Sequence, residues 1–378
     1  MNTHVFGGQG KSTLLIQHSL EALETGGVLF VDPNGDAADT FLSHIPKEKE
    51  VLIIDPTDVD YPVGFNVLYD VRNKPLLASL ILSTVKAIWK YDTIATPVLD
   101  RTLYNTLAAL LEFPGASLLH IEPMLTDKAF RERVLEYVSD PILKRKWQHW
   151  NAKKEKDWEL LIQSTENKAG EFSEDPRIRN IIGQSVTSFD LRRLMFERAV
   201  IVLKLPQGQL GQKTTLFGSL FLAYLLSVAY ERKGIFPFHV FIDDVQHFDT
   251  PILRHLLSDS KRHNLHVTVA NQYLAQLSPE LKSALIGSCD RRITFRCGIE
   301  DSAYLRNSLP ADNTVALHEL GAFEAVFYDN KVKSLIEAKS LTKPLPRGSA
   351  KRRKTLVAQS RRRYGRPRVK VEREIAAL

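Results

Sequence analysis

Short apolar runs alternate along this chain with longer segments whose apolar residues recur at helical spacing. The short runs are rich in β-branched and aromatic residues and are bounded by turn residues, which is typical of buried strands. Eight such runs occur: THVF (3–6), GVLFVDP (27–33), VLIIDP (51–56), AVIVLKL (199–205), FPFHVFID (236–243), LHVTVAN (265–271), RRITFR (291–296) and EAVFY (324–328). Because helical patterns separate most of them, the sequence predicts βαβ units and a mostly parallel sheet.

The strand pattern is interrupted between Pro75 and about Arg193. Leucines at 103, 107, 110 and 111 follow a helical period there. The sequence therefore predicts an α/β core in two parts, 1–74 and 194–342, with an all-helical insertion at 75–193. A proline-punctuated linker after about Thr342 leads to the last predicted segment, 343–378.

Charge sets this last segment apart. The chain carries +7 overall, whereas the residues from Lys343 onward carry +11, because 13 Lys and Arg face only Glu372 and Glu374. The remainder is therefore slightly acidic, at −4. Such a basic tail is typical of a solvated, flexible arm, and its charge also favours contact with nucleic acid, through release of counterions, or with an acidic partner.

Three features bear on where the protein works. No charged and then apolar stretch typical of a signal peptide follows Met1. The most apolar run, 216–230, is shorter than the roughly 20 residues of a membrane span and is expected to be a buried helix. Two cysteines, Cys289 and Cys297, are too few for a disulfide framework. We expect a cytoplasmic protein with no membrane span of its own.

The stretch VFGGQGKST (5–13) has the features of a phosphate-binding loop. It follows a predicted strand and precedes a predicted helix that begins near Thr13, which is the context that a P-loop requires. Loop amides and the helix start would hold phosphates, Lys11 would reach the β- and γ-phosphates, and Ser12 would bind Mg²⁺. The candidate nucleotide-binding residues are Gly7, Gly8, Gln9, Gly10, Lys11, Ser12 and Thr13.

A second acidic element ends another apolar strand, in FHVFIDD (238–244). Asp243 is the candidate for the magnesium side of the site, and Asp244 is the candidate for orienting or deprotonating the attacking water. Paired acids at a strand end also serve as helix caps, but the P-loop in the same chain favours the catalytic interpretation.

Polar residues also end the next two predicted strands. Asn271 and Gln272 follow the first, where a side-chain amide could sense the γ-phosphate. Arg292 and Arg296 belong to the second and are candidates for an arginine finger. Ligands of open α/β sheets bind at the carboxyl ends of strands, which favours a functional role for residues at these positions. His263 and His266 are expected to be structural.

With these residues in place, the chain resembles the HerA–FtsK superfamily of DNA-pumping ATPases, and most of all its TraG/TraD-like coupling ATPases of conjugation and type IV secretion. The order and spacing of several stretches carry the resemblance: THVFG…GKSTLL, FVDPNGDAADTFLSHIP, VLIIDPTDVDYPVGFNVL, LTDKAFRERVLEYVSDP, NKAGEFSEDPRIRNIIGQS, SFDLRRLM, FIDDVQHF, VANQYLAQL, FRCGIEDSAYL and RRRYGRPR.

The resemblance implies a RecA-like P-loop NTPase core that uses ATP and Mg²⁺ to move DNA, assembled as a homo-oligomeric ring, commonly a hexamer. Relaxase or secretion-channel proteins would be its partners and would recruit it to the inner face of the membrane. By position, Asp243 matches the family's metal-side acid, and Asp244 stands where relatives carry a catalytic Glu. Gln272 matches the glutamine after the sensing strand, and Arg296 is the candidate for acting across a subunit boundary.

Two alternatives stay open. Between HVFG and GKST the loop is two residues shorter than the loop of its relatives, which favours an inactive, DNA-binding scaffold as one alternative. The loop also resembles that of ParA/MinD partition ATPases, although Phe6 stands where those enzymes carry a signature lysine.

Overall fold

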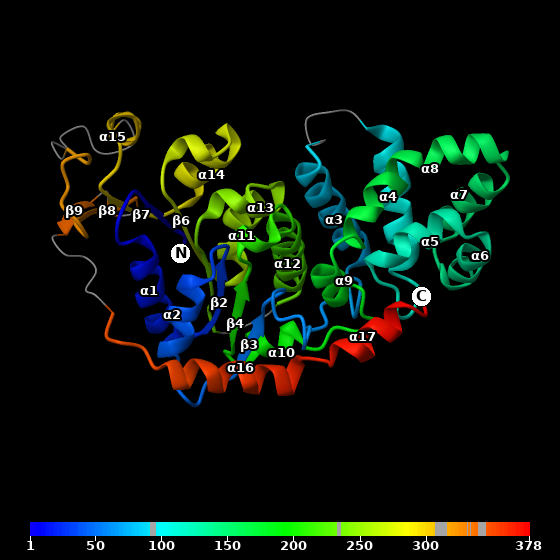
Figure 1. Ribbon diagram of the computed structural model, residues 1–378. Coiled ribbons are helices and arrows are strands. Elements are labelled where there is room, and N and C mark those ends of the chain that lie inside the picture. Colours follow the sequence, from blue (N-terminus) through cyan, green and yellow to red (C-terminus); the bar gives the residue numbers. More distant parts are fainter. Residues whose placement is uncertain (91–95, 233–235, 307–315, 331, 333, 339–344) are drawn as a thin grey trace. The chain divides into compact units, whose positions relative to one another are not determined.

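The structure is a computed structural model that describes residues 1–378 apart from 91–95, 233–235, 307–315, 331, 333 and 339–344. The chain forms a nine-stranded sheet in the order β3-β4-β2-β5-β6-β1-β7-β8-β9 (Figure 1). The strands are β1 Thr3–Phe6, β2 Gly27–Asp32, β3 Val51–Ile54, β4 Val200–Lys204, β5 Phe238–Ile242, β6 Leu265–Asn271, β7 Arg291–Phe295, β8 Ala325–Asp329 and β9 Ser334–Ala338.

The mostly parallel α/β core is confirmed. Strands β1 to β7 are mutually parallel, and β8 and β9 are added to β7 as antiparallel strands. All eight predicted strands are present. The ninth, β9, was not predicted, because the sequence around it lacks the dense β-branched pattern of the others.

The register brings the strand ends that matter to one edge of the sheet. Strand β6 lies between β1 and β5, and Phe6 at the end of β1 pairs with Asn271 at the end of β6. On the other side of β6, Ile242 pairs with Val269, and it also pairs with Val31 of β2. The segments that follow β1, β2, β5, β6 and β7 therefore all leave the sheet at its carboxyl edge.

The chain divides into two compact units. The first consists of Met1–Ile54, Leu191–Gly218 and Val228–Ser360, and the second of Asp55–Asp190, Ser219–Ser227 and Arg361–Leu378. The predicted boundaries at 74, 193 and 342 stay a prediction, because compactness alone does not define an insertion.

The first unit is built on the sheet. Its central strands are buried on both faces, as expected for parallel strands covered by helices. One apolar cluster joins alternate strand residues such as Val28 and Phe30 to Leu15 and Phe41 of the helices that follow β1 and β2. The helices are α1 Lys11–Thr25, α2 Asp36–His44, α10 Leu191–Phe196, α11 Gln207–Leu210, α13 Pro251–Asp259, α14 Pro279–Ser288 and α15 Ile299–Arg306, with 3₁₀ turns at Val245–Phe248, Ser260–His263 and Leu274–Gln276.

The described residues of 75–193 are helical and contain no strand, so the all-helical character of this segment is confirmed. The helices are α3 Lys74–Ile88, α4 Pro97–Leu110, α5 Ile121–Thr126, α6 Lys128–Tyr137, α7 Pro141–Asn151, α8 Glu155–Ala169 and α9 Pro176–Ile182, with 3₁₀ turns at Leu118–His120 and Gly170–Phe172. Asp127, Asp140 and Asp175 cap α6, α7 and α9 by accepting N–H groups of the first turn. Trp147 is fully buried and packs against Trp150, with ring centroids 5.0 Å apart.

One helix among the described residues is long and apolar enough to cross a membrane by composition, α12 Lys213–Tyr230. Of its apolar window, 83% is buried inside the protein. The predicted apolar helix at 216–230 is therefore confirmed as a buried one.

The C-terminal segment is helical and partly buried, which differs from the predicted solvated arm. Residues 343 and 344 lie outside the described part, but the chain then forms α16 Ala350–Tyr364 and α17 Arg368–Ile375. In the first unit, Leu356 and Ser360 of α16 are 1% and 2% exposed. The Ser360 hydroxyl accepts the N–H of Ile53 at 2.9 Å, so α16 supplies an acceptor to the edge strand β3.

In the second unit, α17 packs through Val371, which is fully buried. Its neighbour Arg366 forms an ion pair with Glu374 at 2.7 Å, and the carboxylate of Glu374 also accepts the N–H of Ser185. The charge of the segment predicted solvation, but its apolar residues at helical spacing decide its structure.

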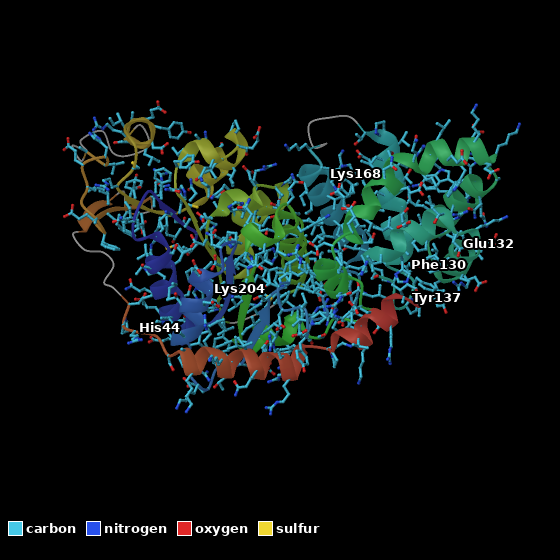
Figure 2. The ribbon with its side chains drawn as sticks, viewed as in Figure 1. His44, Phe130, Glu132, Tyr137, Lys168 and Lys204 are labelled. Carbon is cyan, nitrogen blue, oxygen red and sulfur yellow. The ribbon has the colours of Figure 1, made fainter. Side chains whose placement is uncertain are left out.

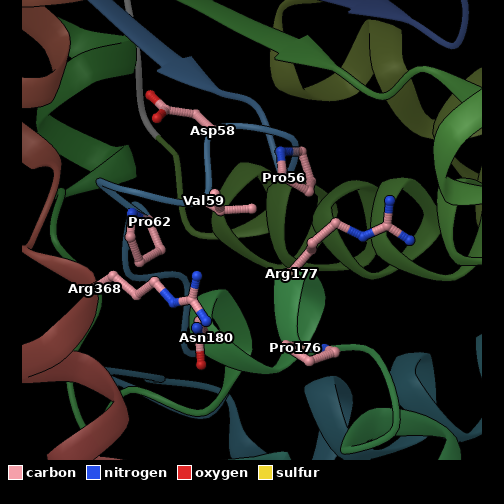
Figure 3. A pocket seen from close by; sticks show the side chains of 8 residues that line it. All are labelled: Pro56, Asp58, Val59, Pro62, Pro176, Arg177, Asn180 and Arg368. Carbon is pink, nitrogen blue, oxygen red and sulfur yellow. The ribbon is translucent and has the colours of Figure 1, made fainter.

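A small cavity of about 60 Å³ lies in the second unit, where α9 and α17 meet the segment after β3 (Figure 3). This volume is far below the several hundred Å³ of a typical ligand site, so the cavity is too small for a nucleotide. Its lining residues are Pro56, Asp58, Val59, Pro62, Pro176, Arg177, Asn180 and Arg368.

We expect Leu356→Ala to lower the free energy of unfolding by about 2 to 5 kcal/mol, because it removes a buried side chain and leaves a cavity in the core. The matched control is Val369→Ala on α17, whose side chain is 58% exposed and should matter little. Chemical denaturation measures both. Equal stabilities for the two variants would contradict the docked position of α16.

Candidate functional site

The loop between β1 and α1 is a tight turn that requires glycine at two positions. Gly7 and Gly10 have φ of 104° and 118°, in the region that favours glycine. A Cβ at Gly7 would lie 2.6 Å from the carbonyl oxygen of Phe295, and one at Gly10 would lie 2.6 Å from the ring of Phe295. The loop is therefore packed directly against the end of β7.

The start of α1 presents backbone donors at the carboxyl edge of the sheet. The helix begins at Lys11, two residues before the predicted start, and no side chain caps it. The N–H groups of Lys11, Ser12 and Thr13 have no acceptor within the helix, because the first intrahelical bond joins Leu14 N–H to Gly10 O. Such a helix start attracts anions, phosphate groups in particular.

Part of the loop is engaged with its neighbours. The N–H of Gly7 bonds to Asn271 O at 3.3 Å, and the N–H of Gly8 bonds to Arg296 O at 2.8 Å. The ammonium of Lys11 donates to the carbonyls of Gly7 and Gly8 at 2.7 and 3.1 Å. Burial lowers the pKa of Lys11, against the raising influence of Asp243 and Asp244. This short loop thus satisfies several of its own polar groups.

Ser12 and Asp243 meet as the sequence predicts. The hydroxyl of Ser12 donates to Oδ2 of Asp243 at 2.6 Å. Burial raises the pKa of Asp243 to about 6, the Ser12 hydrogen bond opposes this rise, and the nearby charges of Asp244 and Asp32 add to it. Burial makes the negative charge of this carboxylate costly in free energy, and a bound cation would offset that cost. A carboxylate beside a hydroxyl is therefore suited to hold a divalent cation.

Asp244 lies beside this pair in a strained backbone conformation, with φ of 42°. Its Oδ2 accepts a hydrogen bond from Nδ2 of Asn34 at 2.6 Å. Asn34 is placed by Asp32, the fully buried last residue of β2, which accepts the N–H groups of Asn34 and Ala38 at 2.8 and 2.7 Å. Two neighbouring strand ends therefore fix one carboxylate.

Sequence reasoning did not identify Asn34 or Asp32 as site residues. A signal was present, because the turn Pro33-Asn34-Gly35 follows an apolar strand directly, and such strand ends gather at one edge of a parallel sheet. That β2 neighbours β5 could not be read from the sequence order of the strands.

Gln272 and Arg296 are exposed and line one open cavity of about 510 Å³ together with Gly8 of the loop. The other lining residues are Tyr273, Cys297, Gly298, Ile299 and His318. The structure therefore brings both side chains next to the loop. Their catalytic roles stay a prediction.

The neighbouring residues Asn271 and Arg292 are internal instead. Asn271 is fully buried, and its Oδ1 pairs with Nε2 of His4 at 2.7 Å. Arg292 is 4% exposed, inside the sheet and facing His4, whose pKa burial lowers to about 4. Asn271 and Arg292 are thus structural neighbours of the site.

The two histidines expected to be structural have different partners. His263 packs on Tyr230 with ring centroids 4.8 Å apart, and His266 packs on His239 at 4.9 Å. Across the described residues, no three His, Cys, Asp or Glu side chains are grouped as metal ligands.

No protein-family model matches the sequence, and no curated protein matches it. Solved structures do match the fold over nearly the whole chain. The plasmid coupling protein TrwB in complex with ADP and Mg²⁺ is similar with a TM-score of 0.65 and 15% identity, covering 91% of this chain and 86% of that one. The unbound TrwBdeltaN70 conjugative coupling protein is similar with a TM-score of 0.64 and 14% identity, covering 90% and 85%.

A further solved structure is also similar over most of its length. VirB4 of Thermoanaerobacter pseudethanolicus is similar with a TM-score of 0.59 and 15% identity, covering 91% of this chain and 90% of that one. The chain therefore has the RecA-like P-loop NTPase fold of these proteins.

We expect the stability of the Asp243→Asn variant, relative to that of the wild type, to increase as the pH rises. Because the folded pKa of about 6 lies above the ordinary value of 3.8, the wild-type fold binds more protons than the unfolded chain between these values. The wild type therefore loses stability over this range, by up to about 3 kcal/mol, and the asparagine variant does not.

Denaturation at a series of pH values from about 4 to 7 measures the difference between the two proteins. Asp157→Asn, at an exposed carboxylate of α8, is the matched control. A difference that stays constant with pH would contradict the burial of the Asp243 charge.

Proposed function

We propose that this protein is an ATPase that drives DNA transport in a conjugation or type IV secretion-like system. The observation that carries the proposal is the contact of Ser12 with the buried Asp243 beside the uncapped start of α1. This arrangement sits on a fold shared with coupling proteins, one of which was solved with ADP and Mg²⁺.

The residues fit a magnesium nucleotide. The N–H groups of Lys11, Ser12 and Thr13 would bind phosphate oxygens, and the Gly7–Gly10 turn leaves no room for a side chain beside them. Ser12 and Asp243 would hold Mg²⁺. ATP would supply the phosphoryl group, and the metal would neutralise its developing charge.

The remaining roles follow from position. Asp244, held by Asn34, would orient the attacking water. Gln272, next to the loop, would sense the terminal phosphate. Arg296 is exposed at the same edge, where a second copy of the chain could place its own nucleotide. We therefore infer a homo-oligomeric ring, such as a hexamer, that threads DNA. Relaxase or channel proteins would recruit this ring from the cytoplasm to the inner membrane face.

One observation favours the inactive-scaffold alternative. The Gly8 N–H bonds to Arg296 O, and the Lys11 ammonium rests on loop carbonyls. Nucleotide binding would have to replace the lysine contacts, and the amide of Gly8 would be released only if the loop moved. The helix start nevertheless keeps its N–H groups free of intrahelical acceptors, which supports the active form. The similarity to coupling proteins does not favour a partition ATPase.

We expect Lys11→Ala to lower the rate of DNA-stimulated ATP hydrolysis about a hundredfold or more, while DNA binding persists. The lysine would contribute charge to the transferred phosphate, whereas it contacts nothing outside the loop that DNA binding would need. Phosphate release with and without duplex DNA measures the rate, and Lys128→Ala at an exposed position is the control.

Hydrolysis by the wild type that DNA does not alter would count against transport. No hydrolysis at all, combined with DNA binding, would establish the scaffold alternative in its place.

We expect Asn34→Ala to lower kcat about tenfold or more and to leave the nucleotide KM nearly unchanged. The Asn34 amide fixes the Asp244 carboxylate, and a small misplacement of a catalytic group costs rate without weakening phosphate binding. Steady-state kinetics measure both constants, with Asn167→Ala on the exposed side of α8 as the control. A rise in KM with unchanged kcat would mean that Asn34 contacts nucleotide instead.

A further inference from the structure

Two segments that are distant in sequence meet on the first unit and bring lysines and arginines together. Ser349 N–H bonds to Ser43 O at 3.1 Å, and His44 Nε2 lies 2.9 Å from Pro346 O. The guanidinium of Arg352 in α16 donates hydrogen bonds to the carbonyls of Ile45 and Pro46, at 3.0 and 2.5 Å. These two bonds join the segments at a second point.

We name the resulting cluster the basic patch and define it as Lys47, Arg347, Lys351, Arg352 and Lys354. All but the partly buried Arg352 are exposed. Figure 2 shows His44 where the C-terminal segment reaches α2, and long side chains projecting from the outer side of α16.

The patch keeps its positive charge because its contacts do not neutralise it. The Arg352 guanidinium donates to neutral carbonyls. Within the described part of the chain, the side chains of Lys47, Lys351 and Lys354 have no hydrogen-bond or ion-pair partner. Across the two segments, 43–49 and 346–354, Glu48 is the one acidic residue.

Other cations of the region are already occupied. Arg353 pairs with Asp39 at 2.6 Å, and the same carboxylate also pairs with Lys204 at 3.1 Å. Arg353 thus serves to dock α16 onto α2. The lysines of the patch are exposed, and their charge is available to something outside the chain.

We propose that the basic patch binds the phosphate backbone of double-stranded DNA. This inference rests on the proposed function, and it assigns DNA a contact surface separate from the nucleotide loop. Clustered lysine and arginine side chains suit phosphates, which are contacted irrespective of sequence.

A membrane surface fits less well. Peripheral helices insert apolar side chains into the lipid boundary. Here the apolar residues of this part of α16, Leu356 and Val357, pack into the core of the first unit. The exposed residues of α16 between Lys354 and Ser360 are Thr355, Ala358 and Gln359, and none of them has a large apolar side chain that could enter a lipid layer.

The test is the triple variant Lys47→Gln, Lys351→Gln and Lys354→Gln in the full chain. It leaves Arg352 and the buried residues of α16 in place, so that the fold is kept, which thermal unfolding checks. Fluorescence anisotropy with a labelled random-sequence duplex, in the absence of nucleotide, measures affinity over a series of salt concentrations.

We expect affinity to fall at least about tenfold near 0.1 M salt, and the slope of log K against log salt to decrease in magnitude by about 2 to 3, because each phosphate contact contributes about 0.9. ATP hydrolysis without DNA should not change, since the patch lies outside the loop. Failure of the proposed function is seen separately, as wild-type hydrolysis that DNA does not stimulate.

The matched control is Lys146→Gln, Lys153→Gln and Lys156→Gln, which removes the same charge from exposed positions of α7, α8 and the turn between them. Lys156 lies between Glu155 and Asp157 in sequence, so its charge is compensated locally. Equal losses in both triple variants, or no loss in the patch variant, would overturn the proposal. So would loss of binding to vesicles of anionic lipid while binding to the duplex is unchanged.

Discussion

The hydrogen bond between Ser12 and Asp243 crosses a strand, and the rest of the site depends on that crossing. The loop follows β1 and the acid follows β5, with β6 between them. The register places the end of β5 two residues short of the ends of β1 and β6, so the Ser12 hydroxyl and the Asp243 carboxylate, from distant parts of the sequence, come within 2.6 Å. Burial makes the negative charge on Asp243 costly, and a cation at this position would relieve that cost.

The shortness of the loop has a structural consequence on its other side. With few residues between β1 and α1, the loop closes on the end of β7, where Phe295 fills the space that a side chain on Gly7 or Gly10 would need. The Gly8 amide then bonds to the backbone of Arg296. Loop length therefore couples the phosphate-binding turn to the strand end that carries Arg296.

The sequence predicts which strands form better than it predicts which strands lie next to one another. Short apolar runs were sufficient to find eight strands. The P-loop motif and the acids at a strand end indicated Ser12 and Asp243, which lie in contact, and their roles stay a prediction. Asn34 was missed because its role depends on β2 lying next to β5, a pairing that strand order along the chain does not contain. The docking of α16 was missed because net charge was weighed above the spacing of Leu356 and Ser360. Local patterns are encoded in short windows, whereas sheet order and docking depend on distant contacts.

The C-terminal segment shows how one residue type serves two purposes within a few positions of a helix. Arg352 and Arg353 bond to carbonyls and to Asp39 of the neighbouring segment, and these bonds help to hold the helix. Lys351 and Lys354 lie on either side of them in sequence and are exposed. Removing the whole segment would therefore confuse two effects, because the edge of β3 would lose Ser360 at the same time as the surface lost its charge. Only substitutions that spare the buried side of the helix can separate recognition of a polyanion from folding.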